Sequence, residues 1–306
     1  MRLDVSTPFS LIPFLERERG QVNDVLARVA AELADDAPAS LRDPIRYALD
    51  TPGKRLRPIL CVAAWRAGGG VADERVYRLA SALEIVHTYS LVHDDLPCMD
   101  DDNLRRGRPT LHRAFDVRVA TLVGAALIPA AVRVLDDAAA ALGLPPRRRA
   151  ELVTELCRAS GARGMVGGQF LDLVAEDRPT GAPELEAIHR RKTGALLAAS
   201  LRIGALASGA PESTLASLSI YGEAVGLAFQ IVDDVLDVTA SADALGKTAG
   251  KDESVGKATY PALFGIDGAR VLASEHVDEA VAALHSAGVQ SPELEALARF
   301  ILERQH

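Results

Sequence analysis

Apolar residues recur every three or four positions along most of the chain, which is the spacing of helices with one buried face. The clearest segments of this kind are Val22–Ala34, Val76–His93, Arg147–Arg163, Glu184–Ala207, Leu215–Leu236 and Val271–Ala287. A further apolar segment, Val117–Val132, is expected to be buried on most sides. Because no run of alternating β-branched residues lies between turn signals, the pattern predicts an all-α fold without strands.

Short clusters of glycine and proline separate these segments. They are Thr51–Gly53, Gly68–Gly70, Gly143–Pro146, Pro179–Pro183 and Gly209–Pro211. Connections of this length join neighbouring helices and are too short to link separate domains. We therefore expect one large helical domain over residues 1–306.

Composition narrows the class of protein. Hydrophobic residues make up 48% and charged residues 25%, as in soluble globular proteins. The net charge of −8 argues against a nucleic-acid-binding domain, and three scattered cysteines argue against a disulfide framework or a zinc site. The start of the chain has no signal-peptide pattern, and the apolar stretch Val119–Val132 is shorter than the ~20 residues of a membrane span. We expect a cytoplasmic protein without a membrane span.

Two clusters of aspartates stand at the C-terminal ends of apolar helical segments. The first contains Asp94, Asp95 and Asp100, and the second contains Asp233, Asp234 and Asp237. Carboxylates at such ends oppose the helix dipole and repel one another, at a cost of tenths to about 1 kcal/mol each, so a cation should offset them. Solvated acidic helix ends would explain one such cluster better than two. Two facing clusters favour Mg²⁺ bound to a diphosphate.

The geometry of the two clusters differs. Asp233 and Asp237 are four residues apart and share a helix face. Asp94 and Asp100 are six residues apart, so they converge only if the chain bends at Pro97. We expect a distorted helix end at the first cluster.

Basic clusters stand beside the acidic ones. Gly53-Lys54-Arg55-Leu56-Arg57-Pro58 opens a predicted helix, whose N-terminal amides favour anions, and Arg105-Arg106-Gly107-Arg108 follows the first acidic cluster. In an acidic protein this arrangement indicates an anion held between cations and a metal, with a salt-bridge network as the alternative. His87 shares a helix face with Asp94, and we expect it to bind a ligand rather than to fill the core.

With these motifs, the chain resembles the trans-isoprenyl diphosphate synthases of the polyprenyl synthetase family, in particular the bacterial farnesyl/geranylgeranyl diphosphate synthase type. Further matching blocks are Gly167-Gly168-Gln169, Lys192-Thr193-Gly194, Phe229-Gln230, Leu245-Gly246-Lys247 and Gly256-Lys257-Ala258-Thr259-Tyr260-Pro261. The resemblance implies an all-α bundle around a central active-site cavity, usually as a homodimer. It also implies head-to-tail condensation of isopentenyl diphosphate with an allylic diphosphate, dimethylallyl or geranyl.

The resemblance assigns roles by position. A cluster of magnesium ions on the allylic diphosphate, three with substrate bound and replaceable by manganese, would be held by Asp94, Asp95, Asp100, Asp233, Asp234 and Asp237. The cations on that diphosphate would be Arg105, Lys192, Lys247 and Lys257. Isopentenyl diphosphate would be bound by Lys54, Arg57, His87 and Arg106. Thr193 and Gln230 would line the reacting carbons.

Product length depends in this family on bulky residues just before the first aspartate motif. Here these positions hold Tyr89 and Ser90. Helical projection places Ser90, but not Tyr89, on the face of Asp94, so Tyr89 as the floor of the hydrocarbon pocket rests on the resemblance alone. An aromatic residue there favours farnesyl diphosphate (C15), with geranylgeranyl diphosphate (C20) as the alternative.

The chain also departs from the family. Ala125 stands where relatives carry an aspartate, and Pro129 enters the same helix. We expect a kink there and the loss of a contact near the active site or the dimer interface. A catalytically silent modulatory subunit is therefore a second hypothesis, although such proteins typically lose one aspartate motif. A class I terpene cyclase is disfavoured by the second aspartate cluster together with Lys54 and Arg57.

Overall fold

The computed structural model describes residues 9–175, 179–239 and 258–304. Its longer helices are α1 (Leu11–Asp35), α2 (Ala39–Leu49), α3 (Leu56–Ala67), α4 (Glu74–Asp94), α6 (Val117–Ala141), α7 (Pro146–Ser160), α8 (Met165–Ala175), α10 (Ala195–Ser208), α11 (Glu212–Thr239), α14 (Tyr260–Ser286) and α15 (Pro292–Glu303). Shorter elements are α5 (Leu111–Ala114), α9 (Ala182–His189), the π-helix η1 (Arg190–Gly194) and the strands β1 (Leu104–Arg105) and β2 (Arg108–Pro109).

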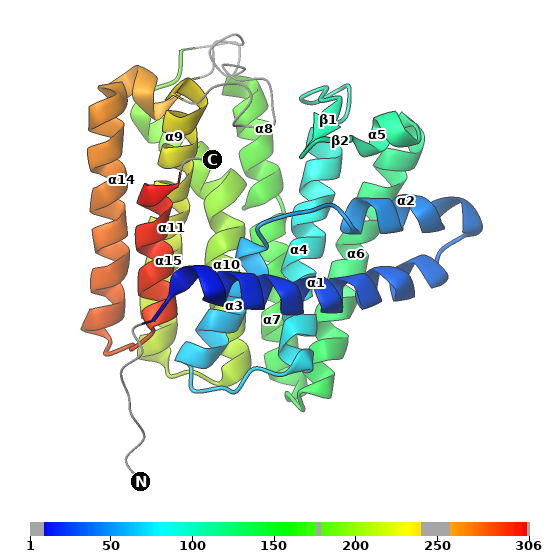
Figure 1. The fold of residues 1–306 in the computed structure, drawn as a ribbon, viewed down its shortest axis with the longest axis horizontal. Coiled ribbons are helices and arrows are strands. Elements are labelled where there is room, and N and C mark those ends of the chain that lie inside the picture. Colours follow the sequence, from blue (N-terminus) through cyan, green and yellow to red (C-terminus); the bar gives the residue numbers. More distant parts are fainter. Residues whose placement is uncertain (1–8, 176–178, 240–257, 305–306) are drawn as a thin grey trace.

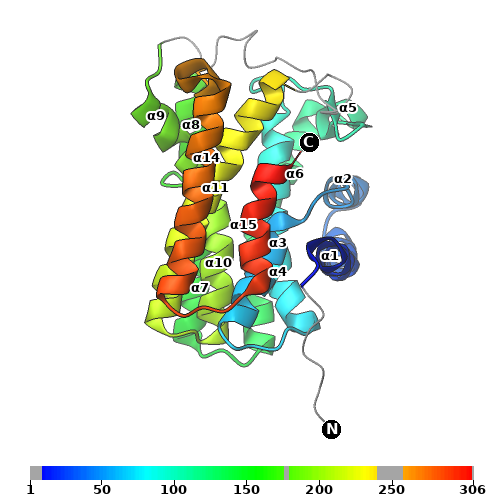
Figure 2. The same ribbon diagram turned by 60° about the vertical axis from the view of Figure 1, so that its left-hand side comes forward.

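Most of the helices run side by side along one direction, whereas α1 and α2 cross them (Figures 1 and 2). Helix α4 packs between α3 and α6, and α10 packs between α3 and α11, with α14 on the outer side of α11. The core consists mainly of Ala, Leu, Val and Ile side chains from these helices. The prediction of an all-α bundle is confirmed.

Each predicted break in the chain falls in a connection between helices. The structure differs from the prediction within Glu184–Ala207, where η1 separates α9 from α10. It also contains β1 and β2, an antiparallel pair of two residues each around Arg106 and Gly107. Strands this short are set by the turn between them and leave no alternating pattern in the sequence.

Helix α6 is less buried than expected. One face packs on α4, but Val117, Leu122 and Ile128 are exposed, so the prediction of burial on most sides is wrong for this chain alone. The helix continues through Pro129 as one α-helix. Ala125 lies on the exposed side.

By length and composition alone, α6 and α11 are apolar enough to cross a membrane. In the structure both are members of the bundle. Burial covers 67% of the most apolar window of α11 and 39% of that of α6. The apolar character of α11 is therefore explained by its place in the core.

Candidate active site

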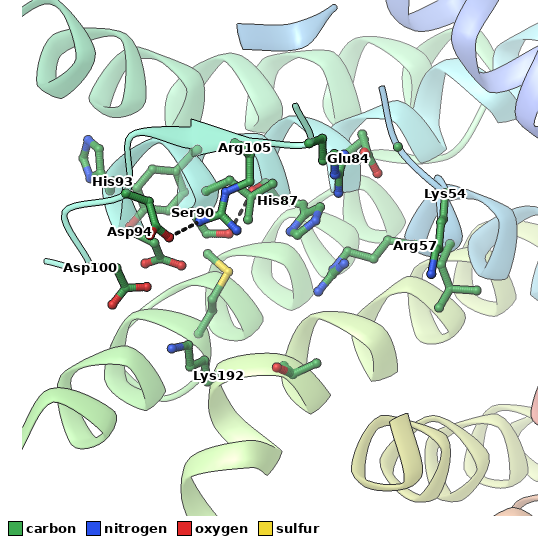
Figure 3. Close-up of a pocket in the computed structure, with 18 of the residues that line it drawn as sticks. Lys54, Arg57, Glu84, His87, Ser90, His93, Asp94, Asp100, Arg105 and Lys192 are labelled. Carbon is green, nitrogen blue, oxygen red and sulfur yellow. Dashed lines mark hydrogen bonds and ion pairs between the residues drawn. The ribbon is translucent and has the colours of Figure 1, made fainter. Parts of the chain in front are cut away.

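A cavity of about 2860 Å³ opens at the end of the bundle where α4 and α11 terminate. Both aspartate clusters and the basic motifs contribute side chains to its lining. In Figure 3, Asp94 and Asp100 lie near Lys192, while Lys54 and Arg57 lie further along the same cavity with His87 beside them. The cavity thus has an acidic part and a basic part.

The first cluster is built by the end of α4. The helix stops at Asp94, and the following turn folds back so that the Asp100 N–H donates to the Asp94 carbonyl at 2.8 Å. The expected distorted helix end is therefore present, and both carboxylates line the cavity. Burial, with the charges of Asp100 and Asp95, raises the pKa of Asp94 to about 6, although Lys192 and Arg105 oppose the rise.

Asp95 differs from its neighbours. Its carboxylate is buried, accepts a hydrogen bond from Arg105 Nε at 3.0 Å, and is not among the side chains that line the main cavity. Arg105 Nη2 also donates to Asp102 at 3.2 Å. Asp95 thus holds Arg105 at the cavity wall, but unlike Asp94 and Asp100 it does not line the main cavity itself.

The second cluster stands on the last turns of α11. Asp233, Asp234 and Asp237 all line the cavity. Arg304, directly after α15, donates to Asp233 Oδ1 at 2.7 Å. Asp234 is buried, accepts a hydrogen bond from the Tyr260 backbone N–H at 3.0 Å, and lies 3.4 Å from His189 Nε2.

The π-helix η1 presents Lys192 and Thr193 to the cavity. Single π-turns of this kind often occur at functional sites. Lys192 Nζ lies 2.6 Å from Asp172 Oδ2, and Thr193 Oγ1 donates to Gln230 Oε1 at 2.7 Å. A Cβ at Gly168 would lie 2.2 Å from the Lys192 backbone N, so the glycine before Gln169 allows α8 to approach η1 this closely.

The basic part is formed by the start of α3 and by side chains from α4 and the β1–β2 turn. The residues that line it include Lys54, Arg57, His87 and Arg106. Burial lowers the pKa of Arg57 to about 10 and, with the charge of Arg304, lowers that of Lys54. Burial and the charges of Arg57 and Arg106 lower the pKa of His87 well below 6.5, so its imidazole is neutral at neutral pH.

Tyr89 and Ser90 both line the cavity. Tyr89 is buried and packs edge-on against His93, with ring centroids 5.0 Å apart. Tyr89 therefore lines the cavity although helical projection places it away from the face of Asp94, because a long aromatic side chain extends well beyond its own Cα.

Some predicted residues lie outside the described ones, namely Lys247 and Lys257. Among the cavity-lining residues that the sequence analysis did not predict are Asp172, Glu84 and Arg304. Asp172 stands three residues after Gln169, on the same face of α8, and this spacing was a usable signal. No pattern in the sequence indicates that Arg304, near the end of the chain, contacts Asp233.

The donor set suits magnesium. Within residues 9–175, 179–239 and 258–304, no three His, Cys, Asp or Glu side chains are close enough to hold a metal by themselves. The cavity instead offers separate carboxylates on two elements, and the raised pKa of Asp94 shows that a nearby cation would stabilise its charged form. Mg²⁺ is typically bound by one or two carboxylates together with substrate phosphates and water.

Comparison with known proteins agrees with this geometry. Residues 38–290 match the family model described as polyprenyl synthetase. The chain is 44% identical to the farnesyl diphosphate synthase of Escherichia coli (strain K12), over 93% of this chain and 95% of the relative. It is 40% identical to the chloroplastic geranylgeranyl pyrophosphate synthase 7 of Arabidopsis thaliana, over 94% of this chain and 83% of the relative.

A solved structure shares the fold. The geranyltransferase of Helicobacter pylori, crystallised with magnesium and isoprenyl diphosphate, superposes with a TM-score of 0.80. It is 30% identical in sequence, and the match covers 97% of this chain and 98% of that one.

Proposed function

This chain belongs to the polyprenyl synthetase family, and from that premise we propose that it is a short-chain trans-prenyl diphosphate synthase. It condenses isopentenyl diphosphate head-to-tail with dimethylallyl or geranyl diphosphate. The observation that carries the proposal is the single cavity with Asp94, Asp100, Asp233 and Asp237 in one part and a cluster of cations in the other. Such a cavity can hold two diphosphates at once.

The allylic diphosphate is assigned to the acidic part. Asp94, Asp100, Asp233 and Asp237 would hold a cluster of three magnesium ions there, with Asp95 and Asp234 supporting them and manganese as a substitute. When bound, the metal ions stabilise the negative charge of the leaving diphosphate. Lys192 adds a fixed cation beside them, and Arg105, held by Asp95, adds a second. Both stabilise the departing diphosphate more than the bound substrate, which lowers the barrier.

Isopentenyl diphosphate is assigned to the basic part, where Lys54, Arg57 and Arg106 supply positive charge. His87, neutral because burial and the surrounding arginines lower its pKa, binds as a hydrogen-bonding group rather than as an ion. Thr193 and Gln230, linked at 2.7 Å, line the space between the two diphosphates where the carbon–carbon bond forms. The released diphosphate is the acceptor for the final proton.

Tyr89 is proposed to close the hydrocarbon end of the cavity and to favour a C15 product. The residue is buried, and its edge-on contact with His93 limits how far the ring can turn aside. Geranylgeranyl diphosphate is the alternative product, formed if the growing chain passes the ring.

The proposal also includes a cytoplasmic homodimer. The exposed face of α6 carries apolar side chains, with Leu122 51% and Ile128 38% exposed, and apolar groups gathered on an exposed face are typical of an interface. A second copy packed on this face would bury it. Leu122→Glu should then convert a dimer into a monomer in analytical ultracentrifugation, and an unchanged mass would refute this interface.

A product assay tests the proposed reaction. Purified protein, Mg²⁺ and isopentenyl diphosphate are incubated separately with dimethylallyl, geranyl and farnesyl diphosphate, and the products are identified by mass spectrometry. C15 from the two shorter primers, with farnesyl diphosphate unextended, supports the proposal, whereas C20 supports the alternative product. Absence of product from every primer would favour the silent subunit, and a cyclic hydrocarbon released from one allylic substrate would favour a cyclase.

A further inference from the structure

Arg55 has an unusual place at the start of α3. It is the N-cap residue of the helix, its backbone is left-handed with φ 55°, and its side chain is buried. A residue other than glycine is strained in this conformation, so contacts with the surrounding structure must hold it there. Lys54, which precedes Arg55, and Arg57, two residues after it, point into the cavity (Figure 3).

Three hydrogen bonds hold the Arg55 guanidinium. Nη1 donates to Glu84 Oε1 at 2.7 Å, Nε donates to Asn23 Oδ1 at 2.8 Å, and Nη2 donates to the Thr51 carbonyl at 2.8 Å. These partners come from α4, from α1 and from the preceding turn. Arg55 thus ties the turn before α3 to two other helices.

The same turn is tied to Arg106. Arg106 Nη1 donates to the Pro52 carbonyl, and a Cβ at Gly53 would lie 2.5 Å from that nitrogen. Glycine at position 53 is therefore required for Arg106 to lie against the turn. The turn, Arg55 and Arg106 form one packed unit at the basic part of the cavity.

Glu84 is the carboxylate at the centre of this unit. Its side chain is 3% exposed, and its charge raises the pKa values of Arg57 and Arg106, opposing the burial and mutual repulsion that lower them. Arg57 needs such support, because its buried Nε has no hydrogen-bond partner among the described residues. Arg57 is thus placed by the backbone that Arg55 fixes rather than by a contact of its own at Nε.

We propose that Glu84 is a positioning residue for isopentenyl diphosphate: by holding Arg55, it fixes the turn that presents Lys54 and Arg57 to the diphosphate. Asn23 supports the same guanidinium from α1. Glu84 acts through the arginines and not by touching the reacting atoms. This inference rests on the proposed function, because it assigns isopentenyl diphosphate to the basic part of the cavity.

Glu84→Gln separates positioning from simple electrostatics. Removal of a negative charge makes the site more positive, which by Coulomb's law alone would tighten the binding of a diphosphate. Loss of the charged hydrogen bond instead releases Arg55 and the turn, which weakens binding. Because hydrogen bonds to charged groups are among the stronger ones, we expect the Kd for isopentenyl diphosphate to rise about tenfold.

Calorimetric titration measures the Kd for isopentenyl diphosphate without turnover, because no allylic diphosphate is present to react with it. Geranyl diphosphate with Mg²⁺, titrated separately, should bind Glu84→Gln within about threefold of wild type, since its site lies in the acidic part. The matched control is Glu18→Gln, which removes another buried carboxylate, paired with Arg66 and Tyr77 outside the cavity lining. It should leave both affinities unchanged.

A second substitution tests whether a carboxylate on Arg55 is what matters. Asn23→Asp places a carboxylate on the Nε side of the same guanidinium and should restore at least half of the affinity lost in Glu84→Gln. If Glu84→Gln does not fold by circular dichroism, Asn23→Ala alone should still weaken isopentenyl diphosphate binding by about threefold, because it removes one hydrogen bond.

The outcomes are distinct. The inference would be overturned if folded Glu84→Gln bound isopentenyl diphosphate as tightly as wild type or more tightly. Where Glu84→Gln does not fold, the same result in Asn23→Ala would overturn it. So would equal losses for both diphosphates, equal losses in Glu84→Gln and Glu18→Gln, or no recovery on adding Asn23→Asp. If wild type neither binds isopentenyl diphosphate nor forms product, the proposed function fails, and this inference fails with it.

Discussion

Asp94→Asn should make the metal-free protein more stable while abolishing its activity. The substitution keeps the size of the side chain but removes a charge that the fold partly buries at the end of α4. Burial raises the pKa of Asp94 from 3.8 to about 6. Since each pKa unit corresponds to 1.36 kcal/mol, the charged form costs the folded state about 3 kcal/mol at most.

The sign and the pH range follow from the raised pKa. The folded protein holds the Asp94 proton more tightly than the unfolded chain, so the carboxylate destabilises the fold progressively as the pH rises from about 4 to about 6. Above pH 6 the full penalty is present. We therefore expect Asp94→Asn to gain about 1 to 3 kcal/mol at pH 7.5 and less than about 1 kcal/mol at pH 4.0.

Urea denaturation of both proteins in EDTA at the two pH values measures this difference. Asp101→Asn is the matched control, because Asp101 is an exposed acid in the same turn and its substitution should change stability by less than about 0.5 kcal/mol. Turnover with Mg²⁺ should fall by orders of magnitude in Asp94→Asn. A variant less stable than wild type at pH 7.5, or a gain that persists at pH 4.0, would refute the reasoning.

Four further substitutions test residues in the cavity wall or packed behind it. Tyr89→Ala should lengthen the product from C15 to C20 in the mass-spectrometric assay, and an unchanged product would exclude Tyr89 as the floor. Gly124→Ala should cost about 1–3 kcal/mol in urea denaturation, because its Cβ would lie 2.2 Å from His93 Nε2 and would displace that ring. Arg304→Ala should lower the stability of the metal-free protein by about 1–3 kcal/mol, because it leaves Asp233 without the hydrogen bond at 2.7 Å. Arg304→Lys should not restore that stability, since a lysine cannot reproduce the guanidinium contact with the Phe229 ring at 3.9 Å; full recovery would contradict this account.

Sequence comparison and structure lead to different interpretations of Ala125, which replaces an aspartate of the family. Its place in a family motif suggested a lost contact near the active site. The structure puts Ala125 on the exposed face of α6, outside the lining of the cavity. The intact cavity therefore supports an active enzyme over a silent subunit. Ala125 lies instead on the face of α6 that is proposed to contact the second copy.

Local patterns in the sequence were sufficient for the all-α fold, the breaks between helices and the two aspartate clusters. Helical period, glycine and proline act over a few residues, so they can be interpreted without knowing what lies opposite. The same holds for the bend after Asp94, because Pro97 constrains the backbone within one turn.

Contacts between distant segments were decided only by the tertiary structure. Asp95 belongs to the same motif as Asp94, yet it is buried against Arg105 and does not line the main cavity. Asp234 does line it, but Tyr260 and His189 contact its buried carboxylate. The partners Glu84 and Arg304 come from elements far from the motifs they support. A motif specifies which side chains are present, whereas packing determines which of them reach the cavity and which hold the others in place.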